Sequence, residues 1–181
     1  MTPFIETFLG EHFQPLAPVP STIFIEDIAH ALSNQCRFSG HSREFYSVGQ
    51  HSVHVSELLE EWGEDEDVQL WGLLHDASEA YLVDLPTPLK QSAFGKDYRR
   101  AEAVLMMAIC DRFGMARVQP ERVFNADVTM LATEARDLMP FKPAHWGELE
   151  VRPREERIDT WMPKVAEFRF LERFRWLDGR R

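Results

Sequence analysis

The chain has 181 residues, of which 44% are apolar and 28% are charged, and its formal net charge is −10. These values exclude a disordered chain and are typical of one soluble domain with a sizeable core. So acidic a protein would also repel the phosphate backbone of duplex nucleic acid. No apolar stretch approaches the ~20 residues of a membrane span, and no signal-peptide pattern or disulfide framework is present, so we expect a cytoplasmic protein.

The first part of the chain predicts an arm, a helix and a loop. Residues 1–21 are rich in proline and predict an irregular arm. Ser21 or Thr22 can cap a first helix. Residues 34–46 interrupt the helical spacing and predict a loop rich in polar side chains. The apolar residues at helical spacing in the first helix are Ile25, Ile28, Ala29 and Leu32.

Two further helices follow the loop. The second is expected over residues 47–62, with His51 on its apolar stripe. The acidic stretch 64–67 favours the start of a third helix, because negative charge stabilises a helix N-terminus. We expect that helix to continue to about Tyr81 and to stop before Pro86.

The remaining elements are also predicted to be helical. Helical patterns cover roughly residues 96–114, 120–138 and 154–177, and no segment shows the alternation of a strand. The sequence therefore predicts an all-α fold with a single domain, whose core covers about residues 22–140. Aromatic residues of the last helix are expected to form a packing stripe or a contact between subunits. They are Phe168, Phe170, Phe174 and Trp176.

The adjacent pair His75-Asp76 interrupts the apolar run that ends at Leu74. Burying even an uncharged polar group costs roughly 2–7 kcal/mol unless something pairs with it. On one continuous helix, Glu79 would lie one turn beyond both members of the pair. A divalent metal ion would be a sufficient partner for this polar group and would bring hydrolytic chemistry.

Two further residues can complete such a metal site. If the second and third helices pack antiparallel, His51 can approach His75. Two imidazoles and a carboxylate suit zinc, manganese, cobalt, nickel or iron, and ligand softness alone does not choose among them. Asp127 lies inside another apolar helix and is the candidate for a fourth ligand; alternatively it is exposed or caps a helix. Either histidine taken alone is more often a satisfied core residue than a ligand.

The order His51, His75-Asp76, Asp127 resembles the HD-domain metal-dependent phosphohydrolases. The segments 50–52, 75–79 and 84–90 are similar to those of the small single-domain nucleotidases in that superfamily. These include the bacterial 5′-deoxynucleotidases and the phage-associated deoxyadenosine triphosphate hydrolases. The resemblance spans roughly residues 30–135 and implies a single HD-domain helical bundle.

The resemblance also implies a role for each matching residue. Glu79 matches the acidic residue that activates or positions the attacking water, and Asp84 matches the acidic residue near the sugar and phosphate. The implied metal ligands are His51, His75, Asp76 and Asp127.

Three residues are implied to contact the substrate. Arg37 matches an arginine that contacts phosphate, and Phe38 stands where these nucleotidases often place a tryptophan near the nucleoside. Lys90 matches a basic residue that adds charge to the phosphate site. As alternatives, Arg37 pairs with surface carboxylates, Arg43 takes the phosphate role, or Lys90 is merely solvated.

Two acidic residues have further structural interpretations. Asp84 could only cap the turn at Pro86. Glu134 shares a helical face with Asp127 and is expected near the site or in a salt bridge.

The expected activity is divalent-metal-dependent hydrolysis of phosphate from a small (deoxy)nucleotide through a metal-activated water. A Mg²⁺ ion is also expected to bind the substrate phosphates. The family also implies a homo-oligomer, and no membrane partner is expected. One alternative is stepwise hydrolysis of a deoxynucleoside triphosphate in place of 5′-monophosphate cleavage. An alternative from a different functional class is a non-catalytic binding module, in which the metal ion only holds the helices together.

Overall fold

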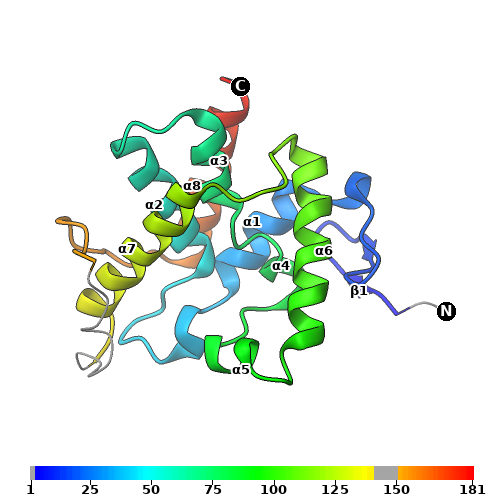
Figure 1. Ribbon diagram of the computed structural model, residues 1–181, viewed down its shortest axis with the longest axis horizontal. Coiled ribbons are helices and arrows are strands. Elements are labelled where there is room, and N and C mark those ends of the chain that lie inside the picture. Colours follow the sequence, from blue (N-terminus) through cyan, green and yellow to red (C-terminus); the bar gives the residue numbers. More distant parts are fainter. Residues whose placement is uncertain (1–2, 141–150) are drawn as a thin grey trace.

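A computed structural model describes residues 3–140 and 151–181, and most of them are helical (Figure 1), which confirms the all-α class. No helix in these two ranges is long and apolar enough to cross a membrane. The α-helices are α1 Ile25–Asn34, α2 Val48–Glu61, α3 Glu66–Leu74, α4 Glu79–Leu82, α5 Thr87–Gln91, α6 Lys96–Phe113, α7 Glu121–Asp137 and α8 Pro163–Asp178. The other elements are the 3-10 helices η1 Pro20–Thr22 and η2 Arg37–Gly40 and the strands β1 Ile5–Glu6 and β2 His12–Phe13.

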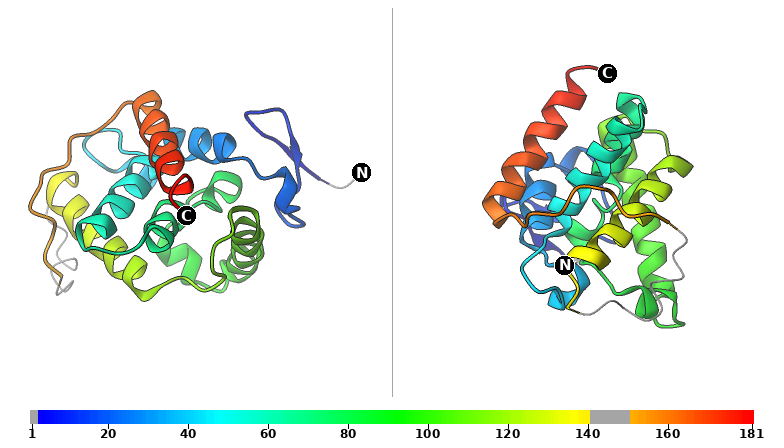
Figure 2. Two further views of the ribbon diagram at one scale, coloured as in Figure 1. Left: turned by 90° about the horizontal axis from the view of Figure 1, so that it is seen from above. Right: turned by 90° about the vertical axis from the view of Figure 1, so that its left-hand side faces the viewer.

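The N-terminal arm contains a small antiparallel hairpin, so the prediction that the chain has no strand is wrong here. Ile5 lies opposite Phe13 in the register of β1 and β2. Strands this short leave no alternation for a sequence pattern to detect. The hairpin lies at one end of the helical body (Figure 2, left). Phe13 is nevertheless buried in the core, which anchors the arm.

Two helices begin later than predicted. Residues 20–22 form the separate turn η1, so α1 begins at Ile25, and its N-cap residue, Phe24, makes no side-chain capping bond. The predicted caps Ser21 and Thr22 are therefore wrong. The last helix begins at Pro163, the position after the N-cap, where a missing N–H costs nothing.

In the α2–α3 hairpin each helix begins at a side-chain cap. Ser47 accepts a hydrogen bond from the Gln50 N–H at 3.0 Å, and Asp65 caps α3 in the same way. Ser56 donates to the carbonyl of Gln69 at 2.9 Å, which ties the two helices together. Their antiparallel packing brings the start of α2 beside the end of α3.

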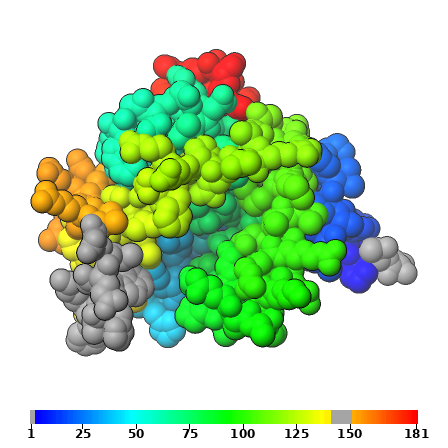
Figure 3. All heavy atoms as spheres, in the orientation of Figure 1, coloured from blue at the N-terminus to red at the C-terminus, as the bar shows by residue number. Residues whose placement is uncertain are grey.

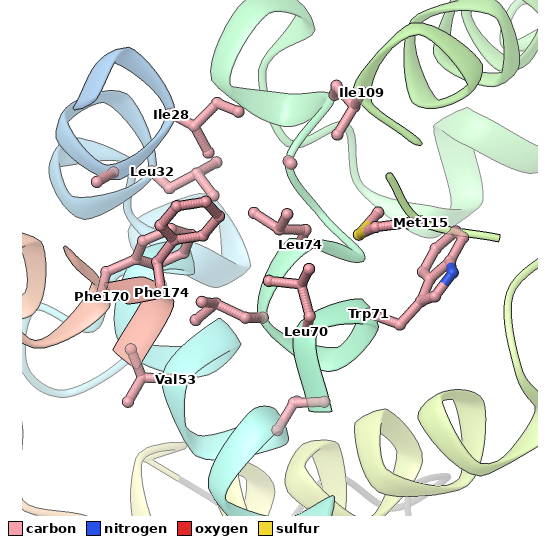
Figure 4. Packing of buried hydrophobic residues seen from close by; sticks show 14 of the residues in the cluster. Ile28, Leu32, Val53, Leu70, Trp71, Leu74, Ile109, Met115, Phe170 and Phe174 are labelled. Atoms are coloured by element: carbon pink, nitrogen blue, oxygen red, sulfur yellow. The ribbon is translucent and has the colours of Figure 1, made fainter. Parts of the chain in front are cut away.

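The α3 helix lies at the centre of the core. Leu70 and Leu74 are fully buried and face side chains from several helices in Figure 4. Phe170 and Phe174 of α8 belong to the same hydrophobic cluster, which confirms the packing stripe at those two positions. Phe168 is exposed. The residues that directly follow Leu74 therefore leave α3 next to the hydrophobic core.

The helices α6 and α7 match the predicted ranges. α6 ends before Gly114, whose left-handed φ of 64° suits a residue without a Cβ. α7 covers the segment that contains Asp127. The short helix α5, after Pro86, was not predicted.

Candidate metal centre

The predicted third helix is interrupted at the His-Asp pair. α3 ends at Leu74 and α4 begins only at Glu79, so the prediction of one continuous helix to Tyr81 is wrong. The Nδ1–H of His75 donates to the Gly72 carbonyl at 2.8 Å, and such a bond competes with the main-chain ladder. The turn therefore places the pair at a helix end, not on a helix face.

The imidazoles of His51 and His75 present the same nitrogen to each other. A carbonyl can only accept, so Nδ1 of His75 carries the hydrogen and its Nε2 keeps a lone pair. Oε1 of Glu134 lies 2.6 Å from Nδ1 of His51 and fixes the hydrogen there in the same way. The two Nε2 atoms face each other at 3.3 Å. Two lone pairs at that distance repel unless a cation, either a proton or a metal ion, stands beside them.

Two carboxylates surround this pair of nitrogens. Asp76 Oδ2 lies 3.2 Å from Nε2 of His75 and 3.8 Å from Nε2 of His51. Asp127 Oδ1, from α7, lies 3.2 Å and 4.0 Å from the Nε2 atoms of His51 and His75, respectively. One atom each from His51, His75 and Asp76 lies within 4.8 Å of the others, a group that could hold a metal ion.

The charged groups of this cluster shift one another's pKa values toward the ionised forms. Burial and Arg37 lower the pKa of His51, but Glu134 and Asp127 outweigh them and raise it to about 9. Burial opposes ionisation of Asp76, yet the two histidines hold the pKa of Asp76 well below its usual range. The carboxylates therefore stay ionised and draw protons onto the imidazoles. The same donors could bind a metal ion in place of those protons.

Arg37 lies against the same carboxylates. Its Nη1 is 3.5 Å from Asp76 Oδ2 and its Nη2 is 3.2 Å from Glu134 Oε2. The interpretation that Arg37 pairs with surface carboxylates is therefore wrong, because Glu134 is fully buried. The expectation that Glu134 forms a salt bridge near the site is confirmed. The alternative phosphate arginine, Arg43, donates to the carbonyl of Pro140 at 2.8 Å.

The two predicted catalytic acids lie within electrostatic reach of Asp76. Glu79 is buried, and its Oε2 has no hydrogen-bond partner among the residues described. Burial, and then the charges of Asp76 and Asp84, raise the pKa of Glu79 to about 10. Asp84 is partly buried, and burial is also the main cause that raises its pKa. The N-cap of α5 is Pro86 and has no side-chain capping bond, so the capping role for Asp84 is wrong.

Gln35 positions both of these acids and was not predicted. Its side-chain N–H donates to the Glu79 carbonyl at 2.9 Å, and its side-chain oxygen accepts from the Asp84 N–H at 3.2 Å. One amide therefore holds the backbone at the start of α4 and just beyond its end. Because both contacts are to backbone atoms, no residue type at positions 79 or 84 could have revealed them.

Two predicted substrate residues occupy constrained positions. Lys90 forms an ion pair with Glu102 and lies 5.6 Å from the centre of the Tyr98 ring, so it is not merely solvated. Phe38 has a left-handed φ of 54°, a conformation that costs of order 1–3 kcal/mol. The Arg37 guanidinium lies 5.4 Å from the centre of the Phe38 ring.

The face of the molecule shown in Figure 3 is hollowed between α7, in yellow-green, and the α5–α6 region, in green. Deeper teal and blue atoms are visible inside the hollow. Its borders are thus formed by the elements that carry Asp127 and Lys90.

Fold and site together define an all-α protein with a His/His/Asp group that could hold a metal ion. No family model matches the chain. It is 40% identical to the uncharacterized protein YfdR of Escherichia coli over 173 residues, which cover 94% of this chain and 93% of that protein. The chain belongs to the same family as YfdR. It is also 36% identical to the uncharacterized protein RCAP_rcc00048 of Rhodobacter capsulatus over 152 residues, which cover 80% of this chain and 77% of that protein.

Proposed function

We propose that the chain is an HD-domain phosphohydrolase that depends on a divalent metal ion and removes phosphate from a small (deoxy)nucleotide. The observation that carries the proposal is the pair of Nε2 atoms of His51 and His75, 3.3 Å apart with both Nδ1 atoms already committed as donors. Imidazoles fixed in this tautomer are oriented as metal ligands. Asp76 and Asp127 complete the proposed ligand set.

The charge balance of the centre fits a metal-dependent reaction. Imidazoles that bind a metal ion are neutral, and with His51 and His75 neutral only Arg37 and Lys90 bring positive charge among the residues predicted for this site; Lys90 shares its charge with Glu102. An anionic phosphate would then be repelled by the ionised carboxylates unless a divalent cation were bound. The carboxylates whose pKa values are lowered are Asp76, Asp127 and Glu134.

Three further residues have a task in the proposed reaction. A bound divalent ion would supply Lewis-acid activation of water at neutral pH. Glu79 would exchange a proton with that water through its unpartnered Oε2. Arg37, whose Nε is also buried without a hydrogen-bond partner, would hold the phosphate oxygens. Phe38, next to Arg37, would face the nucleoside.

The proposed substrate is a deoxynucleotide, because the segments 75–79 and 84–90 resemble those of the small nucleotidases. Cleavage of a 5′-monophosphate and stepwise cleavage of a triphosphate use the same centre. Anion-exchange separation of the products distinguishes them: a nucleoside from the monophosphate, or the successive loss of phosphates from the triphosphate.

The test is phosphate release from a panel of nucleoside mono- and triphosphates with Mn²⁺, Co²⁺ or Zn²⁺ added. We expect metal-dependent release by the wild-type chain and none by the variants His75→Ala and Asp76→Asn. His12→Ala is the matched control, since His12 lies in the hairpin at β2. Circular dichroism would check that each variant stays folded.

Full activity in Asp76→Asn would overturn the proposed mechanism. If the wild-type chain bound one metal ion tightly, with four protein ligands and no nucleotide hydrolysis, the metal-stabilised binding module would be the better explanation. A structural site is closed in this way, whereas a catalytic site keeps an open position. The unpartnered carboxyl oxygen of Glu79 favours the catalytic interpretation.

A further inference from the structure

A second cavity lies beneath the N-terminal hairpin, and none of the proposed metal ligands lines it. Its volume is about 320 Å³, and its walls come from the hairpin region, α1 and α4. This size is at the lower end of the ~300–1,000 Å³ typical of small-molecule sites. It is also far larger than the ~30 Å³ share of one water molecule. The hairpin that covers the cavity is the dark blue segment at one end of the molecule in Figure 2.

Asp27 supplies an unused carboxylate oxygen to this cavity. The residue is only 2% exposed, and its Oδ1 accepts a hydrogen bond from the Leu9 N–H at 2.8 Å. Its Oδ2 is buried and has no partner among the described residues. A buried carboxyl oxygen without a hydrogen-bond partner is costly. Since Asp27 lines the cavity, a ligand there could supply the missing donor.

The Tyr81 hydroxyl adds a second polar group to the same cavity. It is buried, and its hydroxyl hydrogen has no acceptor among the described residues. Burial and the Asp27 carboxylate raise the pKa of Tyr81, while the Phe24 backbone amide opposes the shift. Because the carboxylate and the phenol line the same cavity, one ligand could contact both.

The other walls combine two stacked rings and small apolar groups with the polar residues Glu6 and Thr7, and they carry no lysine or arginine. The ring of Phe8 stacks on that of His30, with centroids 3.8 Å apart and planes 10° apart. His30 is itself held by Glu167, whose carboxylate lies 3.1 Å from Nδ1. Ala31 and Ala80 contribute only small apolar groups. The cavity thus pairs a negative end with a compact apolar body.

We infer that this cavity binds a small organic cation, an amine or amidine on a compact aromatic or apolar body, with the cationic group on Asp27 Oδ2 and the Tyr81 hydroxyl. The charge-assisted bond to Asp27 supplies orientation, and the ring pair supplies apolar contact. Because Ala80 and Tyr81 directly follow Glu79 in α4, the ligand would contact the helix that enters the metal centre. Binding at this cavity does not depend on the proposed phosphohydrolase activity.

The test is a calorimetric titration of the full chain with benzamidine in the presence of a metal chelator. We expect saturable binding at one site, and no binding of benzoate, which has the same ring and the opposite charge. Asp27→Asn should weaken benzamidine binding at least about tenfold, since one partner of a buried charge pair is lost. Glu26→Gln is the matched control and should bind as the wild type does, because Glu26 shares the first turn of α1 but is exposed.

Ala31→Leu provides a second test that does not depend on the folding of the Asp27 variant. The larger side chain would fill part of the cavity, so benzamidine binding should be lost while the thermal unfolding temperature stays at or above that of the wild type. The absence of saturable binding to the wild-type chain would overturn the inference and leave Asp27 a structural residue satisfied by water. Equal binding to wild type and Asp27→Asn, or equal binding of benzoate and benzamidine, would overturn it as well.

Discussion

Glu134 and His51 share a hydrogen bond of 2.6 Å inside the protein, although 83 positions separate them in the chain. Both side chains are fully buried. The bond fixes the hydrogen of His51 on Nδ1 and turns Nε2 toward His75 and the carboxylates of Asp76 and Asp127. A contact between α7 and α2 thereby sets the chemistry of the proposed metal centre.

The first prediction concerns this bond. Glu134→Gln keeps the shape of the side chain but removes the charge that orients His51, so metal affinity should fall about 10–100-fold. Calorimetric titration with Mn²⁺ or Zn²⁺ measures the change. Glu121→Gln, in the first turn of the same helix and exposed, should leave the affinity unchanged. Wild-type affinity in Glu134→Gln would show that His51 does not act as a ligand held by Glu134.

Arg37 should stabilise the metal-free protein. Arg37→Ala would remove the guanidinium that pairs with the buried Glu134 and the partly buried Asp76, and breaking one partner of a buried pair typically costs about 3–5 kcal/mol. We expect a loss of this size in the free energy of unfolding, measured with urea, together with loss of phosphate release. Arg43→Ala is the control, because Arg43 is exposed. Similar stability in both variants would contradict the buried ion pairs described above.

The metal-free protein should lose stability as the pH rises through neutrality. The pKa of His51 is raised from 6.5 to about 9, so its contribution is complete below about pH 6.5 and is lost as the pH approaches 9. Glu79 acts in the same direction, because its pKa is raised from 4.5 to about 10 and only the unfolded chain releases that proton at neutral pH. Urea unfolding with a chelator at several pH values between 6.5 and 9 measures the trend.

Two comparisons sharpen this pH prediction. Glu79→Gln should make the loss of stability with pH less steep, because one of the two proton-binding groups is removed. Bound metal should also reduce the loss, since the ion replaces protons on the imidazoles. Stability that rises between pH 6.5 and 9 in the metal-free wild type would contradict the charge arrangement of the centre.

Gly72 should be required for the close packing of α2 and α3. A Cβ at this position would overlap Cδ1 of the buried Leu59 and come within 3.3 Å of the Ser56 Cα. Gly72→Ala should therefore destabilise the protein by about 1–3 kcal/mol through overpacking, more than the ~1 kcal/mol that alanine adds to helix propensity. Urea unfolding measures the effect. If the overlap is the cause, adding Leu59→Ala should cost less than the sum of the two single changes.

Much of the site follows from helical periodicity. The apolar stripe of α2 places His51 on its inward face, and the pattern around Asp127 places that carboxylate on α7. Antiparallel packing of α2 and α3 was the condition under which His51 was expected to approach His75, and the two Nε2 atoms lie 3.3 Å apart. These features depend on local spacing, which a single sequence contains.

Other features depend on bonds that spacing cannot reveal. The break after Leu74 comes with a bond from the His75 side chain to the Gly72 carbonyl, in a segment whose residue types also suit a continuous helix. Gln35 joins the backbone at Glu79 and Asp84 from another part of the chain. Glu134 was placed on the correct helical face, but its bond to Nδ1 of His51 depends on the tertiary packing of α7 against α2.

The most direct test of the central claim is anomalous scattering from crystals of the chain grown with Mn²⁺, recorded on both sides of the manganese absorption edge. We predict one strong peak in coordination contact with Nε2 of His51, Nε2 of His75 and the carboxylates of Asp76 and Asp127. A peak bound elsewhere, or a cluster that keeps its two Nε2 atoms uncoordinated at saturating Mn²⁺, would contradict the proposed metal centre.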